Sequence, residues 1–169
     1  MITDRMVFLE NMICVFDIDG VLAVHEYGYH RHNACKSYEW DDNIDLIKKV
    51  YRAARCPQQI IDFINARENK KNYVCSVAKS DTEREEKLNF VLQSYPNIPL
   101  SNIFFVQKPK QKLMILNNIF TRNYHTRDLY GSLGGYKSNI YLIDDSVELL
   151  TYIQDNSEYS TLHISSFLD

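Results

Sequence analysis

The chain has 169 residues, of which 45% are hydrophobic and 24% charged, and its formal net charge is −3. This length suits one domain with its own core, and the apolar fraction excludes a disordered chain. No apolar run approaches the length of a membrane span, so we expect that the chain is not an integral membrane protein. The mild acidity does not favour sequence-independent nucleic-acid binding, although a local basic patch would still permit it.

The start of the chain and its cysteines predict a compartment. The first residues contain no apolar segment of the secretory kind, so we expect no export by a standard signal. The four cysteines form no Cys-x-x-Cys motif, and those in strand-like runs are expected to be buried, reduced thiols; they are Cys14, Cys35, Cys56 and Cys75. Both features favour a cytoplasmic protein.

Five short apolar segments predict β-strands, and several are nearly continuous rather than alternating. Such runs are typical of parallel strands that are covered on both faces. In chain order the predicted strands span 12–19, 72–78, 102–107, 139–144 and 161–165.

Apolar residues at helical spacing lie between the predicted strands. Two helices are expected before the second strand, one around 44–54 and one that starts at Pro57. A third begins with the capping box Ser80–Glu83, a fourth at Pro109 and a fifth after Asp145.

This alternation of strands and helices predicts an α/β fold, a three-layer α/β/α sandwich with a doubly wound, mostly parallel sheet of about five strands. We expect a single Rossmann-like domain over 1–169, with a loop or small helical insert at about 24–56.

Acidic residues follow two of the predicted strands. Asp17 and Asp19 are two apart at the end of the first strand, so their side chains are expected on the same face, and Gly20 lets the chain turn. Asp144 and Asp145 end the fourth strand. Parallel strands deliver such residues to one edge of the sheet, where close carboxylates repel unless a cation joins them. A hard, oxygen-seeking ion such as Mg²⁺ (Mg2+) is the expected partner.

A hydroxyl and a lysine complete the predicted site. Ser76 lies in the second predicted strand, and Lys108 follows the third. A compact ammonium group and a hydroxyl are suited to holding the oxygens of a phosphate. Lys110 and Lys112 compete with Lys108 for this role, and we prefer Lys108 because the other two belong to the first helical turn. Ser80 competes with Ser76 but fits better as a helix cap.

Taken together, these motifs resemble those of the haloacid dehalogenase (HAD) superfamily. The resemblance rests on Asp-x-Asp-Gly-Val-Leu at 17–22, Ser76, Lys108-Pro109 and Ile-Asp-Asp at 143–145, which occur in the family's order. The first and last of these motifs are specific, whereas the middle two are single residues. Because little chain is left for a cap domain, the resemblance is to capless or small-cap members.

The resemblance implies a role for each residue. Asp17 would be the nucleophile that forms an aspartyl-phosphate, and Asp19 the general acid/base. Mg²⁺ would be held by Asp17, the backbone carbonyl of Asp19 and Asp145, with Asp144 in support. Ser76 and Lys108 would hold the transferring phosphoryl group. The implied activity is that of a phosphatase acting on a phosphorylated small molecule, nucleotide or polynucleotide end.

Two other functions stay open at this point. A weaker resemblance to the HAD-type phosphatase domains of RNA-repair-related proteins favours an end-processing phosphatase. The aromatic and basic residues of the loop His25–His32 would suit such a substrate. The other alternative is a catalytically inactive binding or regulatory module that keeps the acidic residues.

Overall fold

The computed structural model describes residues 9–24, 44–124 and 136–167. Its sheet has five parallel strands in the order β3-β2-β1-β4-β5. The strands are β1 (Ile13–Phe16), β2 (Asn72–Val77), β3 (Ile103–Val106), β4 (Ile140–Asp144) and β5 (Ser160–His163).

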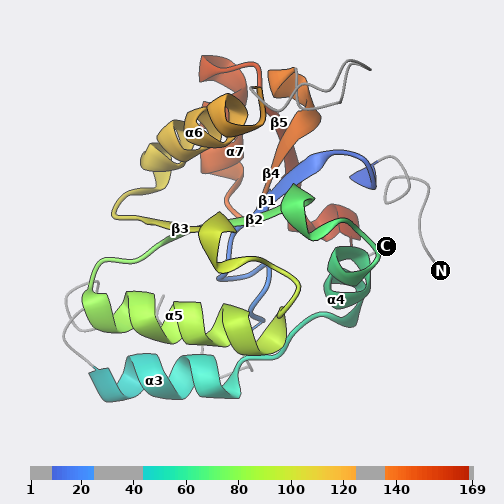
Figure 1. Ribbon diagram of the computed structural model, residues 1–169. Helices are drawn as coiled ribbons and strands as arrows, with labels where there is room; N and C mark the ends of the chain where they lie inside the picture. Colours follow the sequence, from blue (N-terminus) through green and yellow to red (C-terminus); the bar gives the residue numbers. More distant parts are fainter. Residues whose placement is uncertain (1–8, 25–43, 125–135, 168–169) are drawn as a thin grey trace.

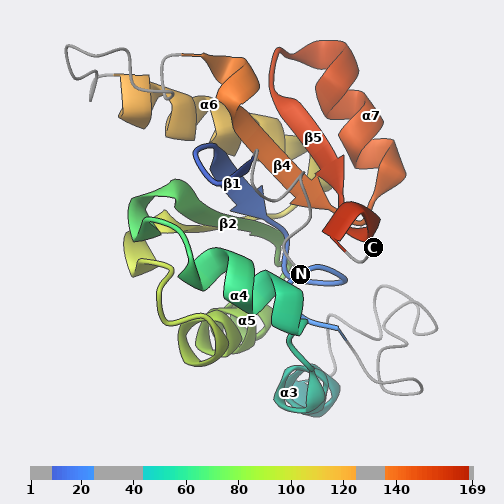
Figure 2. The same cartoon turned by 90° about the vertical axis from the view of Figure 1, so that its right-hand side faces the viewer.

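Helices cover both faces of this sheet, as Figures 1 and 2 show. On one side lie α4 (Gln58–Asn65) and α5 (Asp81–Ser94), with α3 (Ile44–Ala53) packed along α5. On the other side lie α6 (Lys112–Tyr124) and α7 (Val147–Asn156). The predicted three-layer α/β/α fold is therefore confirmed.

β1 divides its side chains between two cores. From β1, Cys14 and Phe16 enter the core under α3, α4 and α5, whereas Ile13 and Val15 enter the core under α6 and α7. This alternation buries both faces of the strand, which explains why its sequence is apolar without a period of two. The thiols Cys14 and Cys75 are free and buried in these cores, as expected.

The order of the strands reverses at β1. The chain runs outward from β1 through β2 to β3, and then returns to place β4 on the opposite side of β1. The segments that follow β1 and β4 therefore lead to opposite faces of the sheet. In sheets of this type ligands bind at the carboxyl ends of the two strands that flank such a reversal.

The ends of several elements differ from those predicted. β1 ends at Phe16, three residues before the expected Asp19, and Pro57 is the N-cap of α4 rather than its first residue. A short 3₁₀ turn, Pro109–Gln111, precedes α6. The range where an insert was expected contains α3. No helix in the described part of the chain is long and apolar enough to cross a membrane.

Candidate active site

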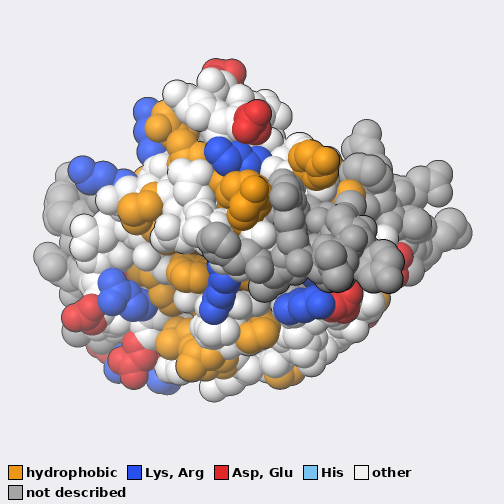
Figure 3. Space-filling model, turned by 45° about the horizontal axis from the view of Figure 1, so that its top comes forward, with side chains coloured by type: hydrophobic (Ala, Val, Ile, Leu, Met, Phe, Trp, Pro, Cys, Tyr) orange, Lys and Arg blue, Asp and Glu red, His pale blue; other side chains and the backbone are white. Residues whose placement is uncertain are grey.

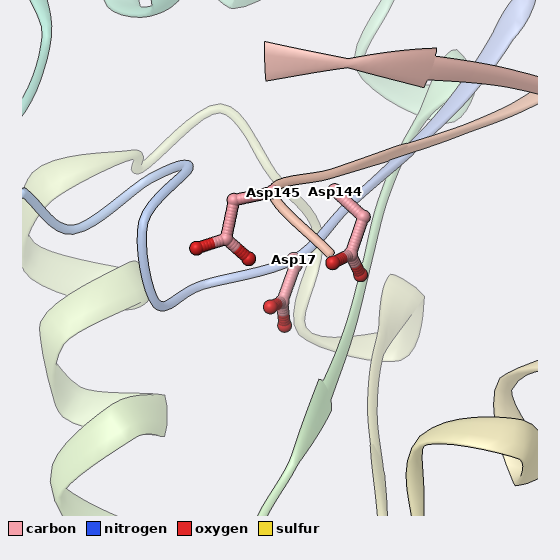
Figure 4. Close-up of side chains that lie close together, drawn as sticks. All are labelled: Asp17, Asp144 and Asp145. Atoms are coloured by element: carbon pink, nitrogen blue, oxygen red, sulfur yellow. The ribbon is translucent and has the colours of Figure 1, made fainter. Parts of the chain in front are cut away.

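The pairing of β1 with β4 brings the acidic residues of the two strands together. Phe16 is paired with Ile143, and the backbone N–H of the next residue, Asp17, donates to the carbonyl of Ile143 at 3.0 Å. Asp17 and Asp144 thus leave the sheet at the same level. Carboxylate oxygens of Asp17, Asp144 and Asp145 all lie within 4.8 Å of one another, and Figure 4 shows the three side chains around one small space.

A tight turn after β1 shapes the space beside Asp145. The N–H of Ala23 donates to the carbonyl of Ile18, and Gly20 has a φ of 76°. A Cβ atom on Gly20 would lie 2.2 Å from Oδ2 of Asp145. Glycine is required at this position both for its backbone conformation and for the close approach of Asp145.

Lys112 is the lysine that reaches the acidic cluster. Its Nζ lies 2.7 Å from Oδ2 of Asp144, where it donates a hydrogen bond, and 3.0 Å from Oδ1 of Asp17. The side chain is 2% exposed. Burial lowers the pKa of Lys112, but the charges of Asp17 and Asp144 outweigh this effect and hold it above its ordinary value. The ammonium group therefore stays charged.

The structure brings Lys112, and not the preferred Lys108, into contact with the acidic cluster. Lys108 is exposed, and its backbone N–H donates to Oε1 of Gln111 at 2.9 Å. The Nζ of Lys110 lies 4.8 Å from the centre of the Tyr152 ring. The expected order of the lysines differs because a 3₁₀ turn, Pro109–Gln111, precedes α6, so that Lys112 is the first residue of α6 and is buried.

Asp19 does not share the direction of Asp17, contrary to the prediction. The alternation of side chains holds only within a strand, and β1 has already ended at Phe16. The carboxylate of Asp19 instead reaches the opposite helical layer. Its Oδ1 accepts from Oη of Tyr51 in α3 at 2.6 Å, and its Oδ2 lies 2.6 Å from Nζ of Lys87 in α5.

Lys87 is buried among several oxygen atoms. Its Nζ lies 2.9 Å from Oε1 of Glu83, one helical turn earlier, and it donates to the carbonyl of Val77. Oγ of Ser76, which is 1% exposed, accepts from the same nitrogen at 3.5 Å. Burial lowers the pKa of Lys87, but the charges of Asp19 and Glu83 raise it above its ordinary value.

The two candidate hydroxyls at the end of β2 have different roles. Ser80 is the N-cap of α5, and its Oγ accepts from the N–H of Glu83 at 3.1 Å. The Glu83 side chain returns to accept from the N–H of Lys79 at 3.0 Å. Ser80 therefore serves the helix, as expected, and Ser76 is the hydroxyl that faces the buried lysine.

The part of the site around Asp17 carries an excess of negative charge. Burial, which Lys112 only partly offsets, raises the pKa of Asp17, and the charges of Asp144 and Asp19 raise it further. Loss of solvent and the charges of Asp17 and Asp144 raise the pKa of Asp145 to about 6. Lys112 thus does not neutralise the cluster of Asp17, Asp144 and Asp145, and bringing a cation among them would remove the repulsion.

One buried oxygen in this cluster has no hydrogen bond. Oδ1 of Asp17 lies near Lys112 but in a geometry that does not make a hydrogen bond, and no other partner among the described residues supplies one. A buried carboxylate oxygen normally has such a partner. An oxygen-rich, negatively charged space with an unsatisfied carboxylate oxygen fits a hard divalent cation such as Mg²⁺.

No protein-family model matches the chain, and no match to it was found among curated proteins. The function proposed for this site is therefore based on the geometry of the described residues and on the resemblance of the four motifs.

Three residues that surround Asp19 were not predicted from the sequence to lie there. Tyr51 and Lys87 belong to expected helices without a predicted role, and Glu83 was predicted only as part of a helix cap. The spacing of Glu83 and Lys87, four residues apart on one helix, was the available signal, but it is also common on exposed helices. The loop His25–His32 lies outside the described residues.

Proposed function

We propose that the protein is a Mg²⁺-dependent phosphohydrolase that forms an aspartyl-phosphate on Asp17. The observation that carries this proposal is the buried Oδ1 of Asp17, which has no hydrogen bond among the described residues and lies 3.0 Å from Nζ of Lys112. An unsatisfied carboxylate beside a fixed positive charge is suited to attack a phosphorus atom whose oxygens that charge can bind.

The proposed reaction has two steps. In the first, a carboxylate oxygen of Asp17 forms a bond to phosphorus, the bond from phosphorus to the leaving oxygen breaks, and Asp19 gives that oxygen its proton. In the second, water attacks the phosphorus while Asp19 takes a proton from it, and the bond to Asp17 breaks. The products are the alcohol and inorganic phosphate, and Asp17 is regenerated.

The remaining residues have supporting roles in this proposal. Mg²⁺ would be held by Asp17, the backbone carbonyl of Asp19 and Asp145, and it would supply charge that offsets the phosphate oxygens. Asp144 orients Lys112 through the 2.7 Å hydrogen bond, which leaves the ammonium group beside Asp17. Ser76 and Lys112 would bind the phosphoryl oxygens.

Charge balance supports the need for the cation. A phosphate group brought to a space already rich in carboxylates would be repelled more strongly than in water, because buried charges are poorly screened. Lys112 alone does not balance the three clustered aspartates. With a divalent cation in place, the phosphate would meet positive charge on two sides.

The test is turnover of a panel of phosphorylated metabolites, phosphopeptides and 3′- or 5′-phosphorylated oligonucleotides in the presence of Mg²⁺. We expect release of phosphate that chelation of the metal stops. Asp17→Asn should lower turnover by about a thousandfold or more, the scale seen when a covalent nucleophile is removed. Retained turnover in this variant would remove Asp17 as the nucleophile.

A polynucleotide end is a second candidate substrate class. Figure 3 shows basic, acidic and apolar side chains interspersed on the face that it draws. Nζ of Lys137 lies 5.6 Å from the centre of the Phe120 ring, and Lys110 lies over Tyr152. Mixed aromatic and basic surfaces suit stacked bases and phosphates. Turnover of an oligonucleotide should then fall steeply with salt, whereas turnover that is indifferent to salt would favour a small substrate.

A further inference from the structure

Asp19 is held at both of its carboxylate oxygens by residues from two different helices. Tyr51 donates to Oδ1 from α3, and Lys87 contacts Oδ2 from α5, each at 2.6 Å. Two short contacts to the two oxygens restrict both the direction and the rotation of the carboxylate. We call Tyr51 and Lys87 the Asp19 clamp.

Further contacts fix the position of Lys87 within the clamp. Glu83 lies 2.9 Å from Nζ of Lys87, and the Lys87 side chain is only 2% exposed. Nζ of Lys87 also lies 5.8 Å from the centre of the Tyr51 ring. The ammonium group is therefore confined between Asp19, Glu83 and the ring of Tyr51, and it has little freedom to leave Asp19.

We propose that Tyr51 and Lys87 are positioning residues that aim the carboxyl group of Asp19 at the leaving oxygen. This inference rests on the proposed function and deepens it, because it makes α3, from the segment between the first motif and β2, a part of the active site. A general acid acts only when it lies within hydrogen-bond reach of the oxygen that it protonates, and small displacements reduce the rate strongly.

The contacts also have a merely structural explanation, in which they tie α3 to α5. Apolar packing already joins these helices, however. Ile47 and Val50 are buried in the shared core, and the rings of Tyr51 and Phe90 lie 6.3 Å apart. Tyr51→Phe keeps the ring and removes only the hydroxyl, so it separates the role of the hydrogen bond from that of the packing.

The leaving group of the substrate distinguishes the two explanations. When the leaving group is acidic, such as dinitrophenol, it departs as an anion and needs no proton. A poor leaving group, such as benzyl alcohol, needs the proton of Asp19 while its bond to phosphorus breaks. If the carboxyl group of Asp19 is misplaced, turnover of a substrate with a poor leaving group should therefore fall much more than turnover of one with an acidic leaving group.

The experiment measures kcat/KM of the Mg²⁺-loaded protein for dinitrophenyl, phenyl and benzyl phosphate. For Tyr51→Phe we expect the loss of kcat/KM for benzyl phosphate to exceed the loss for dinitrophenyl phosphate by roughly tenfold or more. The matched control is Tyr159→Phe, which removes a hydroxyl that donates to Asn117 at 2.8 Å on the α6 and α7 side. It should leave the ratio of the two rates as in the unaltered protein.

In Lys87→Met we expect kcat/KM to fall even more steeply from dinitrophenyl to benzyl phosphate than in Tyr51→Phe. Because this variant leaves Glu83 without its buried partner, it is paired with Glu83→Gln in a double variant, whose folding is checked by thermal melting. An equal loss for all three substrates in Tyr51→Phe, or no loss, would overturn the inference alone. Absence of turnover by the unaltered protein would remove the proposed function and the inference together.

Discussion

The two halves of the site each enclose a buried lysine between two carboxylates, but they are satisfied to different degrees. Lys87 lies between Asp19 and Glu83, and further oxygen atoms accept hydrogen bonds from it. Lys112 lies between Asp17 and Asp144, yet Oδ1 of Asp17 has no hydrogen bond among the described residues. The contacts of the first half hold the Asp19 carboxylate in place, whereas the second half leaves one carboxylate oxygen without a hydrogen bond in the described part of the chain.

The two halves also differ in their net charge. Asp145 adds a third carboxylate to the Lys112 half, where it lies with Asp17 and Asp144 around one space. In the Lys87 half the third group is a hydroxyl and not a carboxylate, because Tyr51 donates a hydrogen bond to Asp19. A hydroxyl donor stabilises a carboxylate, whereas a further carboxylate destabilises it. The half that is left with excess charge is the one in which we expect a cation and a phosphate to bind.

The largest expected effect comes from removing the lysine of the unsatisfied half. Lys112→Met leaves Asp17 and Asp144 buried without their counter-charge, which typically costs about 3–5 kcal/mol of folding stability. We also expect phosphatase turnover to fall by about 10²–10³-fold, as when a charge that binds the transferring group is lost. Denaturant unfolding and steady-state kinetics measure the two effects.

Lys108→Met is the matched control for this change. Lys108 is exposed and its backbone, not its side chain, contacts Gln111, so stability and turnover should stay close to those of the unaltered protein. Lys112→Arg retains a positive charge and shows whether charge alone is sufficient if Lys112→Met does not fold. Loss of turnover in Lys108→Met but not in Lys112→Met would reverse the assignment of the phosphate-binding lysine.

A smaller effect is expected where the turn after β1 meets Asp145. Gly20→Ala places a Cβ against Oδ2 of Asp145 and forces alanine into a left-handed conformation, which costs about 1–2 kcal/mol for the backbone alone. We expect weaker Mg²⁺ binding by calorimetry, because Asp145 must move. In an Asp145→Ala background the contacts with Oδ2 and Cγ disappear and only the contact with the Cβ of residue 145, at 3.2 Å, is left, so little beyond the backbone cost should remain. If the losses of stability caused by Gly20→Ala and Asp145→Ala were simply additive, the proposed contact between the two residues would be wrong.

The smallest effect concerns the pH dependence of stability in the absence of metal. The folded protein raises the pKa of Asp145 from 3.8 to about 6, so the folded state binds this proton more tightly than the unfolded state. Stability contributed by the protonated group is present below about pH 4 and is lost as the pH rises towards 6. Melting temperature should show this downward slope, Asp145→Asn should flatten it, and Mg²⁺ should reduce it. A slope that survives Asp145→Asn would belong to another group.

The sequence was sufficient to predict the sheet and one half of the site. Apolar runs located all five strands, and acidic residues at the ends of the first and fourth were predicted to meet at one edge. Asp17, Asp144 and Asp145 do meet there, because adjacent parallel strands bring their carboxyl ends together. This inference needs only local pattern and the topology of such sheets.

The other half could not be predicted because it depends on where local elements end. The direction of Asp19 follows from the early end of β1 at Phe16, and the choice of Lys112 follows from a short 3₁₀ turn. Element ends are set by tertiary packing and cannot be located to one residue from sequence patterns. Tyr51 and Lys87 belong to helices that come together only when both pack on the sheet, so no local pattern identifies them.

The most direct test is a structure of the protein crystallised with Mg²⁺ and beryllium fluoride, which mimics a phosphoryl group on a carboxylate. We expect a beryllium fluoride adduct on a carboxylate oxygen of Asp17, with Lys112 against its fluorine atoms and a magnesium ion contacted by Asp17 and Asp145. A crevice with neither metal nor adduct at millimolar Mg²⁺ would contradict the account and favour a binding or regulatory role for the protein.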